Sequence, residues 1–294
     1  MRSRFAQGSR LKAQGPIRCL QPSAFSLQRL VLVLSVWFLG QPPVWAFGKP
    51  GVRIWLPESI TTTSPDIDAI FYLVLAITGV AFVLVELTLF IFVVRYRRRP
   101  GQRAYYTHGN HLVELVWTVI PALILVLLAF KSQRVWARVR GTPPPPDLKI
   151  EIIAQQFAWN IHYPGADGMF GRTDPSLIDE TSNPIGLDHT DPHAQDDVVT
   201  LNQLHLPLHQ TILLNLRSKD VIHSFFVPQF RMKQDAVPGL TTRLWLSATK
   251  AGQYPIACAE LCGLGHYRMR GFLTIEAPDT FQAWLTEQLK EQRT

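Results

Sequence analysis

Five residues able to bind a metal ion lie close together near the C-terminus. The segment CAELCGLGHYRMRG contains Cys258, Glu260, Cys262, His266 and Met269. Thiolate, imidazole and thioether form the ligand set of copper used as an electron carrier, because soft sulfur favours Cu(I) and imidazole suits both oxidation states. A loop this short can bring these side chains to one centre. A centre of two coppers would need one more imidazole.

His223, in the segment VIHSFFVP, is the candidate for that imidazole and lies at the end of a strand-like run. Two other uses of the cysteines are open. Cys258 and Cys262 could form a disulfide in an extracytoplasmic compartment, or two thiolates and two histidines could bind tetrahedral zinc. Neither alternative explains Met269 or Glu260.

The spacing within this motif and its distance from His223 resemble the dinuclear CuA site of subunit II of the haem-copper cytochrome c oxidases. The resemblance implies that both thiolates bridge two coppers and that His223 and His266 each bind one of them. It implies weak ligation by Met269 and by the backbone carbonyl of Glu260. The carboxylate of Glu260 would also bind a Mg²⁺ shared with subunit I, since hard oxygen ligands suit that ion; the alternative is a surface carboxylate of which only the backbone matters.

The formal net charge of +7 conceals two halves of opposite sign. Residues 1–141 contain 17 Lys and Arg against 5 Asp and Glu, whereas residues 142–294 contain 12 against 17. A basic, apolar first half and an acidic second half favour a membrane anchor followed by a water-facing domain. The net charge is therefore no evidence for binding to nucleic acid.

The N-terminal segment has the features of an export signal. Six Lys or Arg residues precede the apolar run 30–39, and the small residue Ala46 follows it. This pattern predicts a cleaved signal peptide over residues 1–46. An uncleaved anchor is the alternative, although an apolar run of this length is too short to cross a hydrocarbon core of roughly 30 Å.

Two longer apolar runs predict a transmembrane hairpin over residues 47–141, with spans at about 70–94 and 112–130. The segment RYRRRPGQR between them should stay in the cytoplasm, which places the C-terminal half outside. Glu86 in the first span should face protein, and we favour a contact with another subunit over a proton relay. Glu114, in HLVELVWTVIP, resembles the glutamate at the proton-path entrance of the family, and an exposed interfacial carboxylate is the alternative.

The hydrophobic pattern changes to a period of two after the prolines that follow Gly141. Alternating and β-branched runs predict short strands at residues 148–152, 157–163, 211–216, 243–248 and 271–276. We expect an all-β, Greek-key domain over residues 142–294 that resembles a cupredoxin. Asp279 should cap a C-terminal helix whose apolar face is Phe281, Trp284, Leu285 and Leu289.

The stretch QQFAWNIHYPG resembles the aromatic region where family members receive electrons from cytochrome c. Phe157 stands where many relatives have tryptophan, and Trp159 is retained. Filling of the sandwich core is the alternative for both side chains. The acidic segment 174–197 could steer a basic cytochrome c or could be a solubilising insertion, and Lys219 speaks against steering.

The resemblance implies an oxidase subunit through which electrons enter. CuA would receive them from cytochrome c and pass them through His266 to haem in subunit I, where oxygen is reduced to water and protons are pumped. Subunit III is a further expected partner, and the inner membrane of a bacterium is the expected location. The alternative is a membrane-tethered periplasmic module that binds or delivers copper without oxidase activity.

Overall fold

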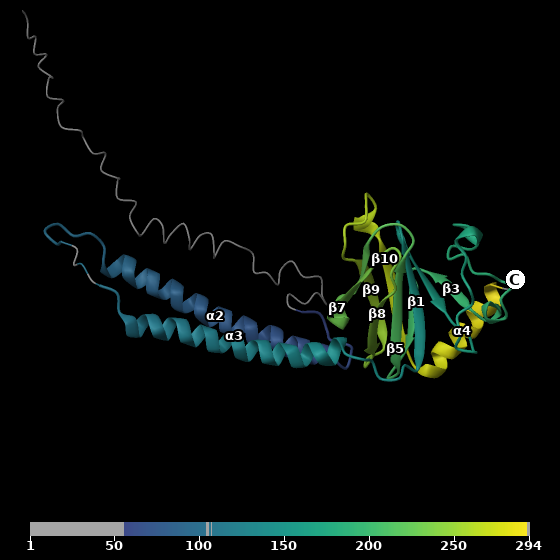
Figure 1. Ribbon diagram of the computed structural model, residues 1–294, viewed down its shortest axis with the longest axis horizontal. Coiled ribbons are helices and arrows are strands. Elements are labelled where there is room, and N and C mark those ends of the chain that lie inside the picture. Colours follow the sequence, from purple (N-terminus) through teal and green to yellow (C-terminus); the bar gives the residue numbers. More distant parts are fainter. Residues whose placement is uncertain (1–55, 104–105, 107, 293–294) are drawn as a thin grey trace, which may run out of the picture. The chain divides into compact units, whose positions relative to one another are not determined.

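The computed structural model describes residues 56–103, 106 and 108–292 of the 294-residue chain. The signal peptide expected over residues 1–46 lies outside this range. Within it, two long helices are followed by ten strands and a C-terminal helix (Figure 1).

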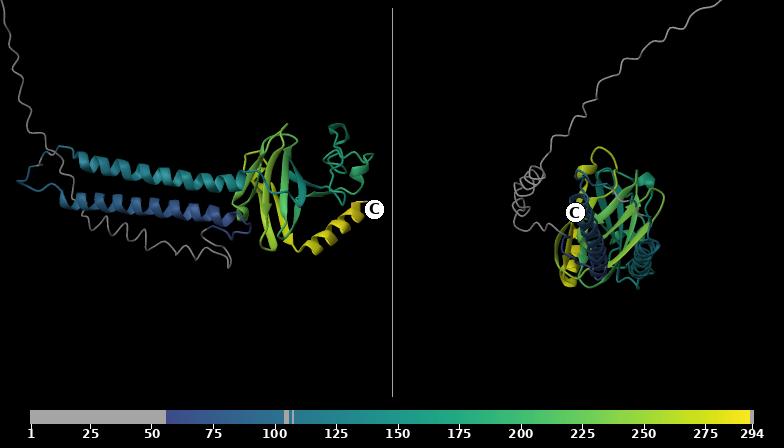
Figure 2. Two further views of the ribbon diagram at one scale, coloured as in Figure 1. Left: turned by 60° about the horizontal axis from the view of Figure 1, so that its bottom comes forward. Right: turned by 90° about the vertical axis from the view of Figure 1, so that its left-hand side faces the viewer.

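The two long helices, α2 (Ser64–Arg95) and α3 (His111–Arg140), form a hairpin whose arms run side by side in both views (Figures 1 and 2). Each is long and apolar enough to cross a membrane. Asn110 caps α3 by accepting hydrogen bonds from two backbone N–H groups. Both helices continue beyond the expected spans, because polar and charged residues extend the helical turns past the apolar core.

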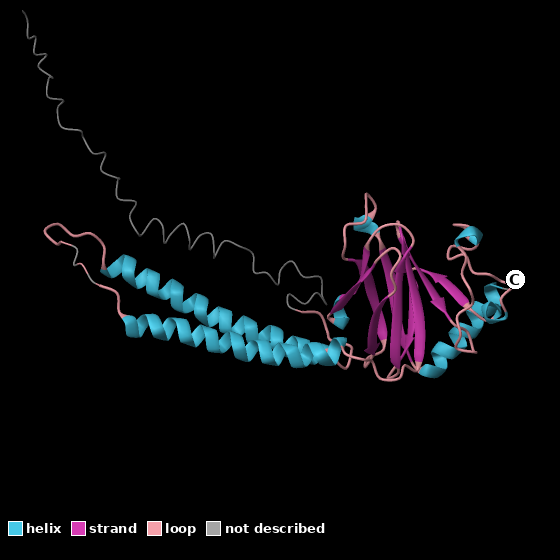
Figure 3. Cartoon of the chain, viewed as in Figure 1, coloured by secondary structure: helices cyan, strands magenta, loops and turns pink. Residues whose placement is uncertain are grey.

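The β domain is a sandwich of two five-stranded sheets (Figure 3). In sheet order, the first sheet contains β3 (Val198–Leu201), β2 (Ala158–Tyr163), β1 (Leu148–Gln155), β5 (Thr211–Ser218) and β8 (Thr242–Ser247). The second contains β4 (Gln203–Pro207), β10 (Arg270–Glu276), β9 (Gly252–Cys258), β6 (His223–Val227) and β7 (Met232–Ala236).

Strand pairing in the sandwich is mixed. β1 pairs in parallel with β5 and β10 in parallel with β4, while the other pairs are antiparallel. Alternate residues of the strands point inward, so Ile150, Ile152, Leu214 and Leu273 are buried in one core between the sheets. The domain is cupredoxin-like, as expected.

The C-terminal helix α4 (Pro278–Gln292) follows β10 directly. Phe281 is buried and Trp284, Leu285 and Leu289 pack against the core, which confirms the expected apolar face. Asp279 lies inside the first turn of α4 rather than before it, because the helix already begins at Pro278.

The segment that precedes α2 also belongs to the β domain. Ile60 is fully buried in the domain core, and its carbonyl accepts a hydrogen bond from the Thr249 N–H at 2.8 Å. Thr61 forms an isolated β-bridge with Ala248. The buried Arg231 side chain bonds Asp68 of α2 with Nε at 2.6 Å. The chain therefore contacts the domain before the hairpin as well as after it.

Residues 164–197, which we call the insertion, connect β2 to β3. They contain two short 3₁₀ turns, Pro175–Leu177 and Pro192–Gln195. Ile185, Leu187 and Ala194 of the insertion pack on Ile153 of β1 as a small separate cluster. The insertion thus covers part of the outer face of the first sheet.

Candidate metal centre

The second sheet brings the candidate ligands together. His223 begins β6 and Cys258 ends β9, and these neighbouring strands pair Phe225 with Cys258. The connection from β9 to β10 contributes the remaining ligands, and we call residues 258–269 the metal loop. His223 was expected at the end of a strand-like run. It instead starts its strand, because residues 219–222 form a turn.

Four of these side chains form a compact, nearly symmetric group. The sulfur atoms of Cys258 and Cys262 lie 3.8 Å apart. Cys258 Sγ is 3.9 Å from Nδ1 of His223, and Cys262 Sγ is 3.7 Å from Nδ1 of His266. Each sulfur therefore has its own imidazole, with the sulfur pair in the middle.

One weaker donor lies at each end of this group. Met269 Sδ is 3.7 Å from Cys262 Sγ, and the backbone oxygen of Glu260 is 3.2 Å from Cys258 Sγ. Cys262, Met269 and His223 are buried, whereas the Glu260 side chain is exposed. The structure thus brings together all six residues that the sequence suggested.

The donor set fits two soft metal ions. Both cysteines are free thiols, and their separation is well beyond the roughly 2.0 Å of a disulfide bond. A single tetrahedral zinc would use the two sulfurs and two imidazoles but would leave Met269 and the Glu260 carbonyl without a role. If the site held two ions, each ion could have one imidazole and one weak donor, in addition to the two sulfurs.

The two thiols differ in acidity. Burial disfavours the Cys258 thiolate, but the hydrogen bond with His223 and backbone hydrogen bonds lower the pKa of Cys258 to about 6. Burial and the nearby Cys258 charge raise the pKa of Cys262 to about 11. At neutral pH one thiolate is available, and binding of a metal ion would displace the proton of the second.

Two residues that the sequence reasoning missed support the ligands. Asp220 Oδ1 lies 2.8 Å from Nε2 of His223, which leaves Nδ1 directed at the sulfur. The backbone N–H of Gln156 donates to Asp220 Oδ2 at 2.6 Å. The side-chain amide of Gln156 donates to the Cys262 carbonyl, also at 2.6 Å. Such contacts fix the orientation of metal ligands. The position of Asp220 three residues before His223 was the available signal.

The two aromatic candidates occupy different layers. Phe157 is half-buried and lies under the metal loop, where a Cβ added at Gly265 would stand 2.4 Å from the Phe157 ring. Trp159 is fully buried, with its ring edge-to-face against Phe225 and 6.2 Å from the His223 ring. Phe157 can therefore meet a docked protein near the metal loop, whereas Trp159 belongs to the core.

Glu114 lies apart from the metal centre, in the first turn of α3. Its carboxylate is 3.4 Å from Nδ1 of His111, and the side chain is about half exposed in the isolated chain. The start of α3 thus carries a partly exposed carboxylate.

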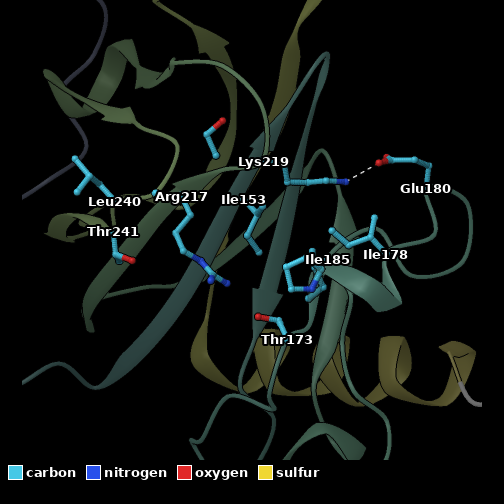
Figure 4. Close-up of a pocket in the computed structure, with 12 residues that line it drawn as sticks. Ile153, Thr173, Ile178, Glu180, Ile185, Arg217, Lys219, Leu240 and Thr241 are labelled. Atoms are coloured by element: carbon cyan, nitrogen blue, oxygen red, sulfur yellow. Dashed lines mark hydrogen bonds and ion pairs between the residues drawn. The ribbon is translucent and has the colours of Figure 1, made fainter.

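A cavity of about 730 Å³ lies beside the insertion rather than at the metal loop (Figure 4). The Lys219 ammonium binds Glu180 Oε1 across its rim and also bonds Gln155 and the Pro184 carbonyl, each at 2.8 Å. Lys219 therefore fastens the insertion to the end of β1. The Lys219 charge is paired with Glu180, so it reduces the negative charge of this surface only a little.

Fold and site together define a class: a membrane-anchored protein whose cupredoxin-like domain carries a cysteine–histidine metal site. Residues 148–276 match the family model described as the periplasmic domain of cytochrome C oxidase subunit II, and residues 51–135 match that of its transmembrane domain. The chain belongs to the cytochrome c oxidase subunit II family. It is thus anchored in a membrane with a periplasmic domain, and membership of the family implies copper binding.

Relatives match over most of their length. The alternative cytochrome c oxidase subunit 2 of Bradyrhizobium diazoefficiens is 36% identical over 88% of this chain and 89% of its own. Cytochrome c oxidase subunit 2 of Thermostichus vulcanus is 33% identical over 78% and 77%. The crystal structure of the periplasmic domain of subunit II of cytochrome oxidase of Bradyrhizobium japonicum shares 27% identity, with a TM-score of 0.38 over 51% of this chain and 99% of that domain.

Proposed function

We propose that this chain is the subunit through which electrons from cytochrome c enter a respiratory cytochrome c oxidase. Bound at the metal loop, a dinuclear CuA centre would supply a one-electron carrier whose charge is shared between two coppers. The observation that carries the proposal is the central sulfur pair of Cys258 and Cys262 with one imidazole at each end.

The chain's own residues would hold this centre rigid and dry. Cys258 and Cys262 would supply the sulfur ligands, and His223 and His266 would supply one nitrogen each. Asp220 accepts from His223 and so holds the ring in place. Burial of Cys262, Met269 and His223 would limit the access of water, so that little rearrangement accompanies a change of charge.

The exposure of two side chains near the metal loop supports a route for the electrons. Phe157, half-buried beside the metal loop, would meet the donor cytochrome c, with Trp159 as packing behind it. His266, also half-buried, would pass electrons to haem in subunit I, where oxygen is reduced and protons are translocated. The exposed Glu260 carboxylate would complete a Mg²⁺ site with subunit I.

The membrane part would organise the rest of the complex. Glu114 at the start of α3 would stand at the entrance of a proton path in subunit I, and subunit III would complete the assembly. We place the protein in the inner membrane of a bacterium, with a signal peptide over residues 1–46 removed, the hairpin over 47–141 and the copper domain over 142–294.

The second candidate is a membrane-tethered module that binds or delivers copper without oxidase activity. The metal loop alone would serve either function, because both need the same ligands. Purification of the tagged full-length chain from its native membrane separates the two. If the chain is an oxidase subunit, the purified sample should contain a haem-bearing subunit and should oxidise cytochrome c. If the chain is a delivery module, the sample should show neither.

Electron paramagnetic resonance of the copper-loaded full-length chain tests the metal assignment. We expect a hyperfine pattern from one unpaired electron shared equally by two copper nuclei, with two coppers per chain. A pattern from a single copper nucleus, or a site filled by zinc from a medium that contains both metals, would refute the dinuclear centre.

A further inference from the structure

Glu86 is an ionisable side chain in the membrane-spanning part of α2. It lies nine residues before Arg95, the cytoplasmic end of the helix, which corresponds to about 14 Å at 1.5 Å per residue. The hydrocarbon core is roughly 30 Å thick, so Glu86 stands near its middle. A carboxyl group at this depth is unfavourable unless it faces protein or water.

The other helix of the hairpin does not cover Glu86. Ile70, Leu73 and Ile77 are the partly buried positions in the apolar part of α2, and they mark the face of α2 that turns toward α3. Ile77 is nine residues from Glu86, or two and a half helical turns, which puts the two side chains on opposite faces. Glu86 forms no hydrogen bond or ion pair with any residue in the described part of the chain.

The threonines of the apolar spans satisfy themselves. The hydroxyl groups of Thr78, Thr88 and Thr118 each donate to the backbone carbonyl four residues earlier, at 2.7–2.8 Å. Glutamate has no such local solution when its carboxylate needs donors, because the N–H groups inside a helix are already bonded. Lipid chains also offer no donor. A charged Glu86 therefore requires a polar group from outside the hairpin.

The surface around Glu86 suits close approach of another helix. Leu75, Gly79 and Val93 share the face of Glu86, because they lie seven or eleven residues from it, close to whole numbers of turns. A Cβ added at Gly79 would meet no other atom within 4 Å. Small residues at membrane helix interfaces allow backbones to come close. We call these four residues the Glu86 face.

We propose that the Glu86 face docks a transmembrane helix of the haem-bearing partner subunit, and that this helix donates a hydrogen bond or an ion pair to the Glu86 carboxyl. The proposal rests on the proposed function, because it supposes an oxidase partner. It adds a specific contact in the middle of the bilayer, on the side of α2 away from α3. The carboxyl group would then help to select and orient the partner.

The test uses the complete oxidase, extracted in mild detergent through a tag on this chain. Glu86→Leu removes the acceptor, Glu86→Gln keeps a hydrogen-bonding group, and Leu84→Ala changes a neighbouring position near the opposite face at the same depth. The double variant Glu86→Leu/Leu84→Glu keeps the carboxyl group but moves it away from the Glu86 face. The haem-to-copper ratio after increasing detergent exposure measures retention of the partner subunit.

We expect Glu86→Leu to weaken retention of the haem-bearing subunit about 3- to 30-fold, the range that corresponds to one intramembrane hydrogen bond. Glu86→Gln and Leu84→Ala should stay near the wild type, and the double variant should not recover. Wild-type retention in Glu86→Leu would overturn the proposal. So would normal retention with lost turnover in Glu86→Gln, because that outcome indicates a proton relay. The dinuclear copper signal, recorded on the same samples, tests the proposed function separately.

Discussion

The metal loop and the insertion are both long connections of the same β domain, but they are held in different ways. The metal loop is fixed from outside, by groups on other strands and turns, such as His223 of β6 and Gln156 after β1. The insertion is fixed mainly from within, by its own aspartates. The comparison teaches that a site for chemistry needs contacts that converge from distant parts of the sequence, whereas a surface loop can be ordered by its neighbours alone.

The aspartates of the insertion show this local ordering. Their carboxylates accept hydrogen bonds from backbone N–H groups two or three positions ahead, as in Asp174, Asp179, Asp188 and Asp191. Such turns are a common use of aspartate. Many acidic groups of the insertion therefore shape its backbone as well as giving it negative charge.

Substitution of one of the two central sulfurs should have the largest effect, and only on the metal loop. In Cys258→Ser a hydroxyl replaces the soft thiolate, so we expect complete loss of the dinuclear copper signal and of electron transfer. Met269→Leu is the matched control, because it removes only a weak donor and should retain both coppers with slower transfer and a shifted potential. Metal analysis and electron paramagnetic resonance decide the outcome. Two coppers with an unchanged spectrum in Cys258→Ser would contradict the ligand set.

Besides the contacts of Lys219, the insertion has a buried anchor that is not local. Asp197 Oδ2 lies 2.6 Å from Nε2 of the fully buried His162 and accepts from the Gly171 N–H at 2.8 Å. Asp197→Ala should lower the free energy of unfolding by about 3–5 kcal/mol, because it leaves a buried partner without its counter-charge. Asp174→Ala, at an exposed local turn of the same insertion, should change it much less. Equal effects in chemical unfolding would remove the distinction between anchor and local turn.

The fit between Phe157 and the metal loop gives a smaller, testable effect. Gly265→Ala would place a Cβ 2.4 Å from the Phe157 ring, and overpacking of this kind costs about 1–3 kcal/mol. We expect lower thermal stability and faster loss of copper. The double variant Gly265→Ala/Phe157→Ala should recover part of both, because the smaller side chain makes room. Additive losses in the double variant would show that the two positions are independent.

A pH dependence should distinguish the insertion from the metal loop. Burial alone would lower the pKa of His162, but Asp197 and Glu151 raise the pKa above its ordinary value of 6.5. The stabilisation is fully present below the unfolded pKa and is lost as pH rises through the folded value. The protection factors of residues 166–171, in which hydrogen-exchange rates are corrected for the intrinsic rise of exchange with pH, should therefore fall above neutral pH. His162→Gln should abolish this change, and a retained pH response in that variant would assign it to another group.

Sequence reasoning predicted the elements with strong local patterns. The hairpin follows from two apolar runs, and β1, β5 and β10 follow from inward-facing aliphatic residues at a period of two. β7, with the sequence MKQDA, and β9, which contains a proline, have no such pattern and are strands because β6 lies between them and pairs with both. The candidate metal ligands were predicted from residue type and spacing. The contact of Gln156 with the Cys262 carbonyl was not predicted, because it depends on how the metal loop folds back onto the end of β1.

The burial of Ile60 has a mechanical consequence for the domain. A body attached at one point can turn about its linker in any direction, but a body attached at two points can turn only about the line that joins them. The hairpin is connected to the β domain at two places: Ile60 and Thr61 contact the domain before α2, and β1 enters it after α3. Two attachments thereby limit the ways in which the metal loop can turn relative to the hairpin.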